Sequence, residues 1–147
     1  MNAEAEVLAA NDAFYAAFNG RDAEAMEEIW SRRSPCACIH PGWNALFGRP
    51  RIMASWQAIF EGGGAPPVQP SAAEVLVLGQ SAFVVCLENI PGTTLVATNI
   101  FVNEDGLWRM VHHQAAPIAR AMVDPDVEPE PEPDTEPDSG GSGGLLN

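Results

Sequence analysis

The sequence contains no lysine: its seven basic residues are all arginines, set against 20 acidic residues and a net charge of −13. Nucleic-acid binding needs a clustered positive surface that neutralises phosphates, so this charge balance argues against such a partner. The chain also has no apolar run that approaches the roughly 18 residues of a membrane-spanning helix. We therefore expect neither nucleic acid nor a membrane among its partners.

Cysteine is scarce, with only Cys36, Cys38 and Cys86. An odd number of thiols cannot all pair, and Cys36 and Cys38 lie too close together on an extended segment for an easy disulfide. The first residues include Glu4 and Glu6, where a secretory signal would carry positive charge. These features predict a cytoplasmic protein with free thiols.

The C-terminal part of the chain differs in composition from the rest. Residues 124–138 hold eight acids, several prolines and no base, and a glycine and serine run follows at 140–144. Such a segment cannot bury enough apolar area to offset the entropy of ordering it. We predict one domain over residues 1–120 and a disordered acidic tail over 121–147, whose simplest role is to aid solubility, with specific docking as the alternative.

Hydrophobic periodicity divides the domain into helices followed by strands. Helical spacing of apolar residues predicts helices over 3–19, 23–31 and 50–61. Extended patterns predict strands over 36–40, 72–78, 81–90, 94–103 and 107–115. The first strand is bounded by Pro35 and Pro41, which favours an edge position, whereas the last three are joined by short turns typical of an antiparallel meander. This order predicts an α+β fold.

Several short segments, in this order and spacing, resemble the SnoaL-like branch of the nuclear transport factor 2-like superfamily. They are Phe14-Tyr15-Ala16-Ala17-Phe18, His40-Pro41-Gly42-Trp43, Gly48-Arg49, Ser55-Trp56 and Trp108-Arg109-Met110-Val111-His112-His113. The resemblance covers about residues 5–117. It implies a cone-shaped half-barrel, in which three N-terminal helices pack on a strongly curved, mostly antiparallel sheet and enclose a cavity open at one end.

The same resemblance implies a homodimer formed through the outer face of the sheet. Members of the superfamily include isomerases, cyclases and dehydratases, and also non-catalytic modules such as a kinase association domain, so the fold by itself does not give the function. The chain shows no clear counterpart of the full catalytic sets of ketosteroid isomerase or of limonene epoxide hydrolase.

Two polar residues on the predicted strands are candidates for chemistry. Glu88 is the only ionisable residue in the middle of strand 81–90. It lies either at an exposed edge or in a semi-dry pocket, where its pKa would rise toward the range useful to a general base. Asn99 could orient a carbonyl or hydroxyl group of a ligand, or it could satisfy a neighbouring backbone group.

The last strand carries two adjacent histidines, His112 and His113, which point to opposite faces. The similarity of its Trp-x-x-Val-His segment to the kinase association domain implies that His113 faces the cavity with Glu88 and Asn99, and that His112 faces a dimer partner. The inward set is then Arg109, Val111, His113 and Ala115. A slip of one residue in register would exchange the two histidines. A neutral imidazole opposite a carboxylate could move protons between carbon and oxygen, as isomerases and dehydratases require.

Aromatic residues supply a candidate pocket wall. Tyr15, Trp43 and Trp56 could contact a ligand with His40, although core packing explains aromatic residues equally well, and it is the favoured reading for Trp30 and Trp56. His40 precedes the Pro-Gly-Trp turn and could either hydrogen-bond that turn, which is favoured, or line the mouth of the cavity.

The cysteines do not form a convincing metal site. Cys36, Cys38 and His40 would share one face of a strand, but they lack a turn-spaced pair and a fourth ligand. We expect no metal and no cofactor.

The sequence therefore predicts a pocket for a small, mostly apolar organic ligand. The favoured function is acid-base chemistry of the isomerase, dehydratase or cyclase kind, with Glu88, Asn99 and His113 as catalytic residues. The alternative is a non-catalytic dimerisation or regulatory module with a vestigial or ligand-sensing pocket.

Overall fold

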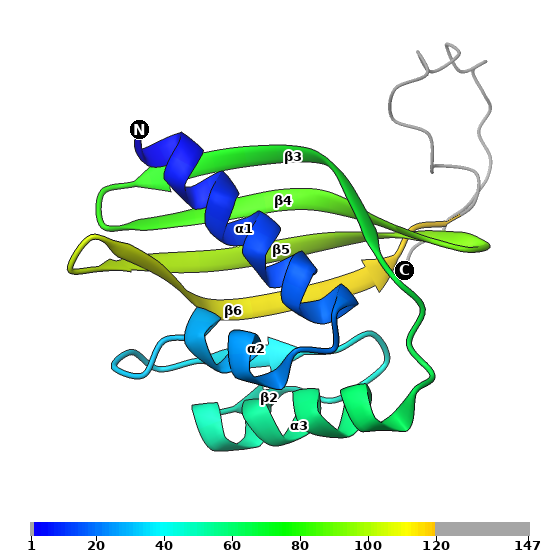
Figure 1. Cartoon of the computed structure of the whole chain (residues 1–147). Helices are drawn as coiled ribbons and strands as arrows, with labels where there is room; N and C mark the ends of the chain where they lie inside the picture. Colours follow the sequence, from blue (N-terminus) through cyan, green and yellow to red (C-terminus); the bar gives the residue numbers. More distant parts are fainter. Residues whose placement is uncertain (1, 120–147) are drawn as a thin grey trace, which may run out of the picture.

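A computed structural model describes residues 2–119, so the predicted acidic tail lies outside the described residues. Three helices and six strands follow one another along this part of the chain (Figure 1). They are α1 (Ala3–Asn19), α2 (Ala23–Ile29), β1 (Ala37–Ile39), β2 (Leu46–Phe47), α3 (Arg49–Gly62), β3 (Gln69–Leu78), β4 (Ser81–Ile90), β5 (Thr93–Glu104) and β6 (Leu107–Pro117).

Local signals explain where the helices begin and end. The Asn2 and Asp22 side chains cap α1 and α2 by accepting hydrogen bonds from backbone amides three residues later, at 2.8 Å and 3.0 Å. The left-handed residue after α1 is Arg21, with φ of 51°, and not Gly20 as the Asn-Gly pair suggests. Gly63 ends α3 at φ of 71°, a conformation that glycine adopts without strain.

The strands form one mixed sheet in the order β2-β1-β6-β5-β4-β3. Strands β3 to β6 pair antiparallel as a meander, which confirms the prediction, whereas β1 runs parallel to β6. The expected edge position of β1 is wrong, because β2 pairs with its other side. The two prolines that suggested an edge stand outside β1, and β2 is too short to give a sequence signal.

A bulge in β6 changes which side chains face the helices. Phe101 pairs with Met110 while Ile100 pairs with His112, so Val111 has no partner in β5. Met110 is therefore fully buried, whereas Arg109 and Val111, both predicted to face inward, are only partly buried. His113 and Ala115 beyond the bulge are buried as predicted.

The helices lie against one face of the curved sheet, which produces the predicted three-helix, cone-shaped α+β arrangement (Figure 1). The core between the two layers comes from helix and strand residues alike, among them Phe14, Met26, Trp30, Ile52, Trp56, Val84, Phe101 and Met110. No helix in residues 2–119 has the length and apolar character needed to span a membrane.

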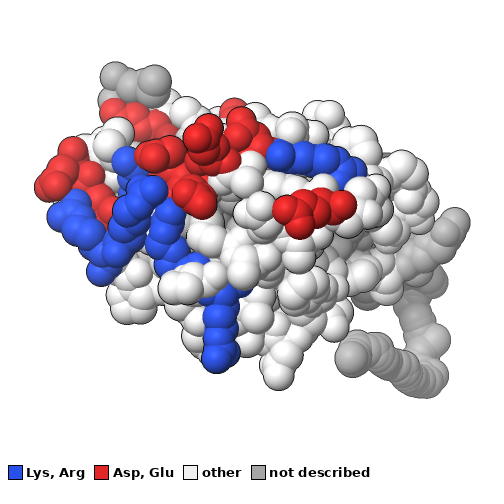
Figure 2. Space-filling model, turned by 60° about the horizontal axis from the view of Figure 1, so that its bottom comes forward, with Lys and Arg blue, Asp and Glu red and all other residues white. Residues whose placement is uncertain are grey.

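Charged side chains of both signs lie together on one face of the molecule. Figure 2 shows arginines interleaved with acidic residues at one end of the molecule. Arg33 contacts Asp105 at 2.9 Å, and Arg32 contacts Glu28 at 3.7 Å. This surface therefore offers little unpaired positive charge to an anionic partner.

Candidate functional site

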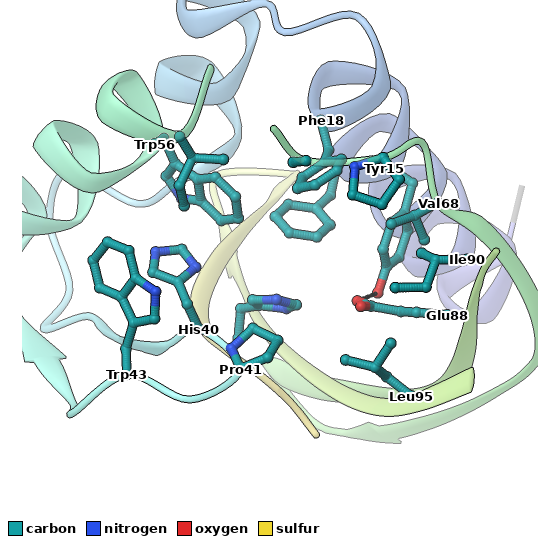
Figure 3. Close-up of a pocket in the computed structure, with 15 residues that line it drawn as sticks. Tyr15, Phe18, His40, Pro41, Trp43, Trp56, Val68, Glu88, Ile90 and Leu95 are labelled. Carbon is teal, nitrogen blue, oxygen red and sulfur yellow. Dashed lines mark hydrogen bonds between the residues drawn. The ribbon is translucent and has the colours of Figure 1, made fainter. Parts of the chain in front are cut away.

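A pocket of about 250 Å³ opens between the helices and the curved sheet. Figure 3 shows Tyr15 and Glu88 on one side of it, and His40, Trp43 and Trp56 on the other. Most of its wall is apolar. The lining residues are Phe14, Tyr15, Phe18, His40, Pro41, Trp43, Trp56, Ile59, Ala65, Pro66, Val68, Glu88, Ile90, Leu95 and His113.

Glu88 and Tyr15 form the first polar pair of this pocket. The Tyr15 hydroxyl, from α1, donates to Oε2 of Glu88, from β4, over 2.6 Å (Figure 3). Burial raises the pKa of the Glu88 carboxyl, and the tyrosine hydrogen bond only partly offsets this rise. Burial and the neighbouring carboxylate also raise the pKa of Tyr15. The pair therefore holds a carboxyl group that exchanges its proton at higher pH than an exposed glutamate.

His113 and Asn99 form the second polar pair. Nδ1 of His113 lies 2.6 Å from Oδ1 of Asn99. The Asn99 amide nitrogen donates to Oδ1 of Asn11 at 2.8 Å and to the Tyr15 hydroxyl at 3.2 Å, so its oxygen is left to accept from the imidazole. This arrangement assigns the proton of His113 to Nδ1 and leaves the lone pair on Nε2.

The electrostatic setting of His113 keeps the imidazole neutral. Burial, with smaller contributions from His40 and His112, lowers the pKa of His113 to about 3. A neutral imidazole whose Nδ1 is occupied presents Nε2 as a hydrogen-bond acceptor or a base. Since His113 lines the pocket, it can serve a bound molecule in either role.

Asn99 itself does not line the pocket. It is fully buried and lies behind Tyr15 and His113, with its side chain joining both. The structure thus brings together the three predicted catalytic residues, but it gives Asn99 the position of a support between the other two. Tyr15, predicted as a pocket wall, also belongs to this network.

His40 lines the pocket, and its side chain does not bond the following turn. Its Nε2 lies 2.8 Å from the Ser55 hydroxyl, which itself donates to the Ile52 carbonyl over 2.7 Å. The hydroxyl must therefore accept from Nε2–H of His40. The turn is closed by the backbone, where the Trp43 amide donates to the His40 carbonyl at 2.9 Å. Burial lowers the pKa of His40 to about 4, so this imidazole is also neutral.

The three predicted tryptophan candidates divide between the pocket wall and the core. Trp56 is buried beside His40, with ring centroids 4.6 Å apart, and it lines the pocket. Trp43 stands at the pocket with 46% of its surface exposed. Trp30 is fully buried, is absent from this pocket and pairs with Met110, which agrees with a packing role.

The sequence interpretation missed two members of the polar network, Asn11 and Cys86. The Asn11 amide nitrogen and the Tyr15 hydroxyl approach the sulfur of Cys86 at 3.9 Å and 3.5 Å. Asn11 occupies a position on the apolar face of α1, where a polar residue requires a partner. A polar residue on an apolar helix face was therefore the sequence signal that could have identified Asn11.

The cysteines stay free and buried in the described part of the chain. Within residues 2–119, no group of three or more histidine, cysteine or acidic side chains is arranged to hold a metal ion. The chemistry that the pocket itself can supply is proton transfer by Glu88 and His113.

Comparison with protein families matches the description "SnoaL-like domain" to residues 7–120 of the chain. The chain belongs to the SnoaL-like family. The match runs from Val7 in α1 to beyond the end of β6, and it therefore includes every residue of the pocket.

Solved structures extend this SnoaL-like assignment to the NTF2-like superfamily, as the sequence resemblance predicted. A candidate dehydratase of the NTF2-like family from Streptomyces avermitilis is 29% identical, with a TM-score of 0.72 over 78% of this chain and 95% of that one. A protein from Thiobacillus denitrificans, described as a candidate calcium/calmodulin-dependent protein kinase type II association domain, is 33% identical, with a TM-score of 0.68 over 76% of this chain and 94% of that one.

One curated relative is a larger protein. The SnoaL-like chain is 26% identical over 112 residues to the F-box protein SKIP8 of Arabidopsis thaliana, which covers 75% of this chain and 48% of that protein. The chain thus spans about half the length of this relative.

Proposed function

We propose that this SnoaL-like protein is an acid-base enzyme that dehydrates or isomerises a small, mostly apolar organic molecule. The observation that carries the proposal is the placement of Glu88 and His113 on one aromatic-lined pocket, where Tyr15 in the wall and Asn99 behind it join the two. Two titratable groups whose pKa values are shifted by burial, in one concave site, are typical of acid-base catalysis.

The two groups can divide a dehydration between them. Nε2 of His113 removes a proton from the carbon next to a carbonyl group, and the electron pair of that C–H bond forms the new C=C bond. The C–O bond to the hydroxyl on the neighbouring carbon breaks, and the Glu88 carboxyl protonates the departing oxygen, which leaves as water. In an isomerisation, the proton taken from one carbon is returned to another.

The supporting residues fix this division of roles. Asn99 accepts from Nδ1 of His113 at 2.6 Å, which keeps the base at Nε2. Tyr15 holds one oxygen of Glu88 at 2.6 Å, so the other oxygen is available to the pocket. Both are therefore positioning residues in this mechanism.

The second candidate function is a non-catalytic dimerisation or regulatory module. It is favoured by the 33% identity to a structure described as a kinase association domain and by the apolar outer face of the sheet. Leu76, Leu78 and Val96 on that face are each at least 40% exposed. Apolar surface of this kind supports a homodimer formed through the sheet.

A substrate panel tests the enzymatic proposal. The full chain is incubated in D₂O with cyclic β-hydroxyketones of one and two rings. NMR follows two signals: deuterium incorporation at the carbon next to the carbonyl group reports proton exchange, and loss of the signal of the hydroxyl-bearing carbon reports dehydration. We expect at least one ketone to exchange or dehydrate more than about 100-fold faster than in buffer, the lower range of general acid-base catalysis.

Matched variants separate the site from the fold. His113→Asn and Glu88→Gln change the pocket, whereas His112→Asn and Glu74→Gln change neighbouring strand positions that do not line it. The first two should lose the activity and the second two should keep it. Absence of exchange and dehydration across the panel, or equal activity in all four variants, would refute the enzymatic proposal.

A further inference from the structure

The hydrogen-bond directions at the polar end of the pocket restrict what can bind there. Nδ1–H of His113 is committed to Asn99, so Nε2 meets a ligand as an acceptor. The Tyr15 hydroxyl is committed to Oε2 of Glu88, and in residues 2–119 the other oxygen of that carboxyl has no hydrogen-bond partner. A ligand therefore faces one imidazole acceptor and one carboxyl oxygen.

The remaining N–H groups of the lining lie away from this polar end. Nε2–H of His40 is used by Ser55. The indole N–H of Trp56 is buried without a partner among the described residues and does not open onto the cavity. Trp43 stands at the exposed part of the pocket. No donor besides Glu88 in its protonated form is thus available beside His113 in this part of the chain.

A hydroxyl group matches this inventory better than a ketone, a carboxylate or a phosphate. It donates to Nε2 of His113, and its oxygen accepts from Glu88 in the protonated form. A ketone has no proton to donate and leaves the imidazole unpaired. A carboxylate or phosphate would face the lone pair of His113 Nε2 and the Glu88 carboxyl group, and no arginine lines the pocket to neutralise its charge. Burying such an unpaired charge is unfavourable.

The rest of the wall sets the apolar part of the ligand. Phe14, Phe18, Trp56, Ile59 and Leu95 surround the space with rings and aliphatic groups. Its volume of about 250 Å³ lies below the range of roughly 300–1,000 Å³ that holds drug-sized ligands. One or two fused rings therefore suit the space better than an extended chain or a polyol.

We propose that the pocket selects an uncharged one- or two-ring compound by a hydroxyl group that contacts Glu88 and Nε2 of His113. This inference names the substrate class of the proposed function, and it rests on that function because both use the same site. The contact with His113 belongs to the bound complex before reaction: the hydroxyl must release Nε2 before that nitrogen takes a proton from carbon, while Glu88 keeps its contact with the departing oxygen. The selection is a property of binding and needs no turnover.

A series of probes that share one ring system tests the selection. Calorimetric titration of the full chain at pH 7.5 compares 2-tetralol with 2-tetralone, 2-aminotetralin and tetralin-2-carboxylate, each up to 5 mM. We expect 2-tetralol to bind about tenfold more tightly than the ketone, the effect of one unpaired polar group, and the carboxylate not to bind. Tighter binding of the amine, the ketone or the carboxylate, or no binding of 2-tetralol, would overturn the inference.

Variants assign the preference to the polar end. His113→Asn and Glu88→Gln should each reduce the preference for 2-tetralol over 2-tetralone to less than about threefold, while His112→Asn keeps it; thermal unfolding checks that each variant is folded. Retention of the preference in both pocket variants would also overturn the inference. If the preference holds but no β-hydroxyketone reacts, the proposed enzymatic function alone fails; if dehydration occurs without the preference, this inference alone fails.

Discussion

His113 and Asn99 are directly opposite each other on β6 and β5, and their side chains meet with 2.6 Å between Nδ1 and Oδ1. Neighbouring strands in register place such residues on the same face of the sheet. The sheet therefore brings a histidine beside the one group that fixes its tautomer, and α1 adds Asn11 and Tyr15 to hold that group in place.

Replacing Asn99 by alanine should destabilise the protein strongly. The change leaves buried groups on His113, Asn11 and Tyr15 without a partner, and each unsatisfied group costs about 1–3 kcal/mol. We expect Asn99→Ala to lower the free energy of unfolding by about 2–4 kcal/mol, measured by urea denaturation. The exposed Asn44→Ala serves as the control, with a change within about 0.5 kcal/mol. Equal effects of the two changes would contradict a stabilising role for the Asn99 hydrogen bonds.

The free energy of unfolding should decrease as the pH falls below 6.5, because two histidines are buried in the neutral form. The native pKa values of His113 and His40 are lowered to about 3 and about 4, from 6.5. Between pH 6.5 and these values the unfolded chain binds protons that the native state does not. Each histidine therefore lowers the free energy of unfolding by about 1.4 kcal/mol for each unit that the pH falls. Urea midpoints at pH 4.5, 5.5, 6.5 and 7.5 should show this slope, and His113→Asn, which retains a donor for Asn99, should make it shallower. An unchanged slope in the variant would show that His113 titrates normally.

Glu88→Gln should stabilise the protein relative to the natural chain at high pH but not at low pH. Because the native pKa of Glu88 is raised from 4.5, its stabilising contribution is present below pH 4.5 and is lost as the pH rises through the native value. Glutamine does not ionise and can still accept from Tyr15. The difference in unfolding free energy should therefore be small at pH 4.5 and favour the variant at pH 8. A variant that is equally destabilised at both values would mean that the carboxylate is not buried.

Asn19 should control the part of the pocket wall that precedes β3. Its side chain makes two hydrogen bonds of 2.8 Å with the backbone of Val68, one as donor and one as acceptor. Asn19→Ala should lower the free energy of unfolding by about 1–2 kcal/mol and speed amide hydrogen exchange at Val68 and Gln69. Exchange at β5, which is distant in the sheet order, provides the internal reference. Unchanged exchange at Val68 would count against this role.

The proposed homodimer can be tested on the outer face of the sheet. Val96 is 40% exposed there, and Leu8 on α1 is similarly exposed, at 37%. We expect sedimentation velocity to show a dimer for the natural chain and for Leu8→Asp, and a monomer for Val96→Asp, because a charge in an apolar interface is left unpaired. A monomeric natural chain would disprove the homodimer.

Local patterns in the sequence account for most of the elements. The spacing of apolar residues predicted α1 at its observed bounds and α3 within one residue at each end. Side chains alternate between the two faces of a strand, so Glu88 lies on the same face of β4 as Val84 and Cys86, and all three are buried. These predictions succeed because helix and strand periodicity is a property of neighbouring residues.

Long-range pairing decided the features that the sequence interpretation missed. The parallel pairing of β1 with β6 joins strands that are distant in the chain. The two-residue β2 and the bulge at Val111 depend on how neighbouring strands pair, which the residues of one strand do not specify. A bulge leaves no clear mark in the sequence, yet it moved Met110 inward while His113 kept its predicted face.

The sequence by itself determined the α+β order of the elements and a short set of polar residues that are unusual within apolar strands. Only the tertiary structure decided that Asn99 supports the pocket from behind and that Tyr15 bonds Glu88. The physical reason is that a hydrogen bond depends on distance and direction between side chains from different elements, and packing of α1 against the sheet sets both.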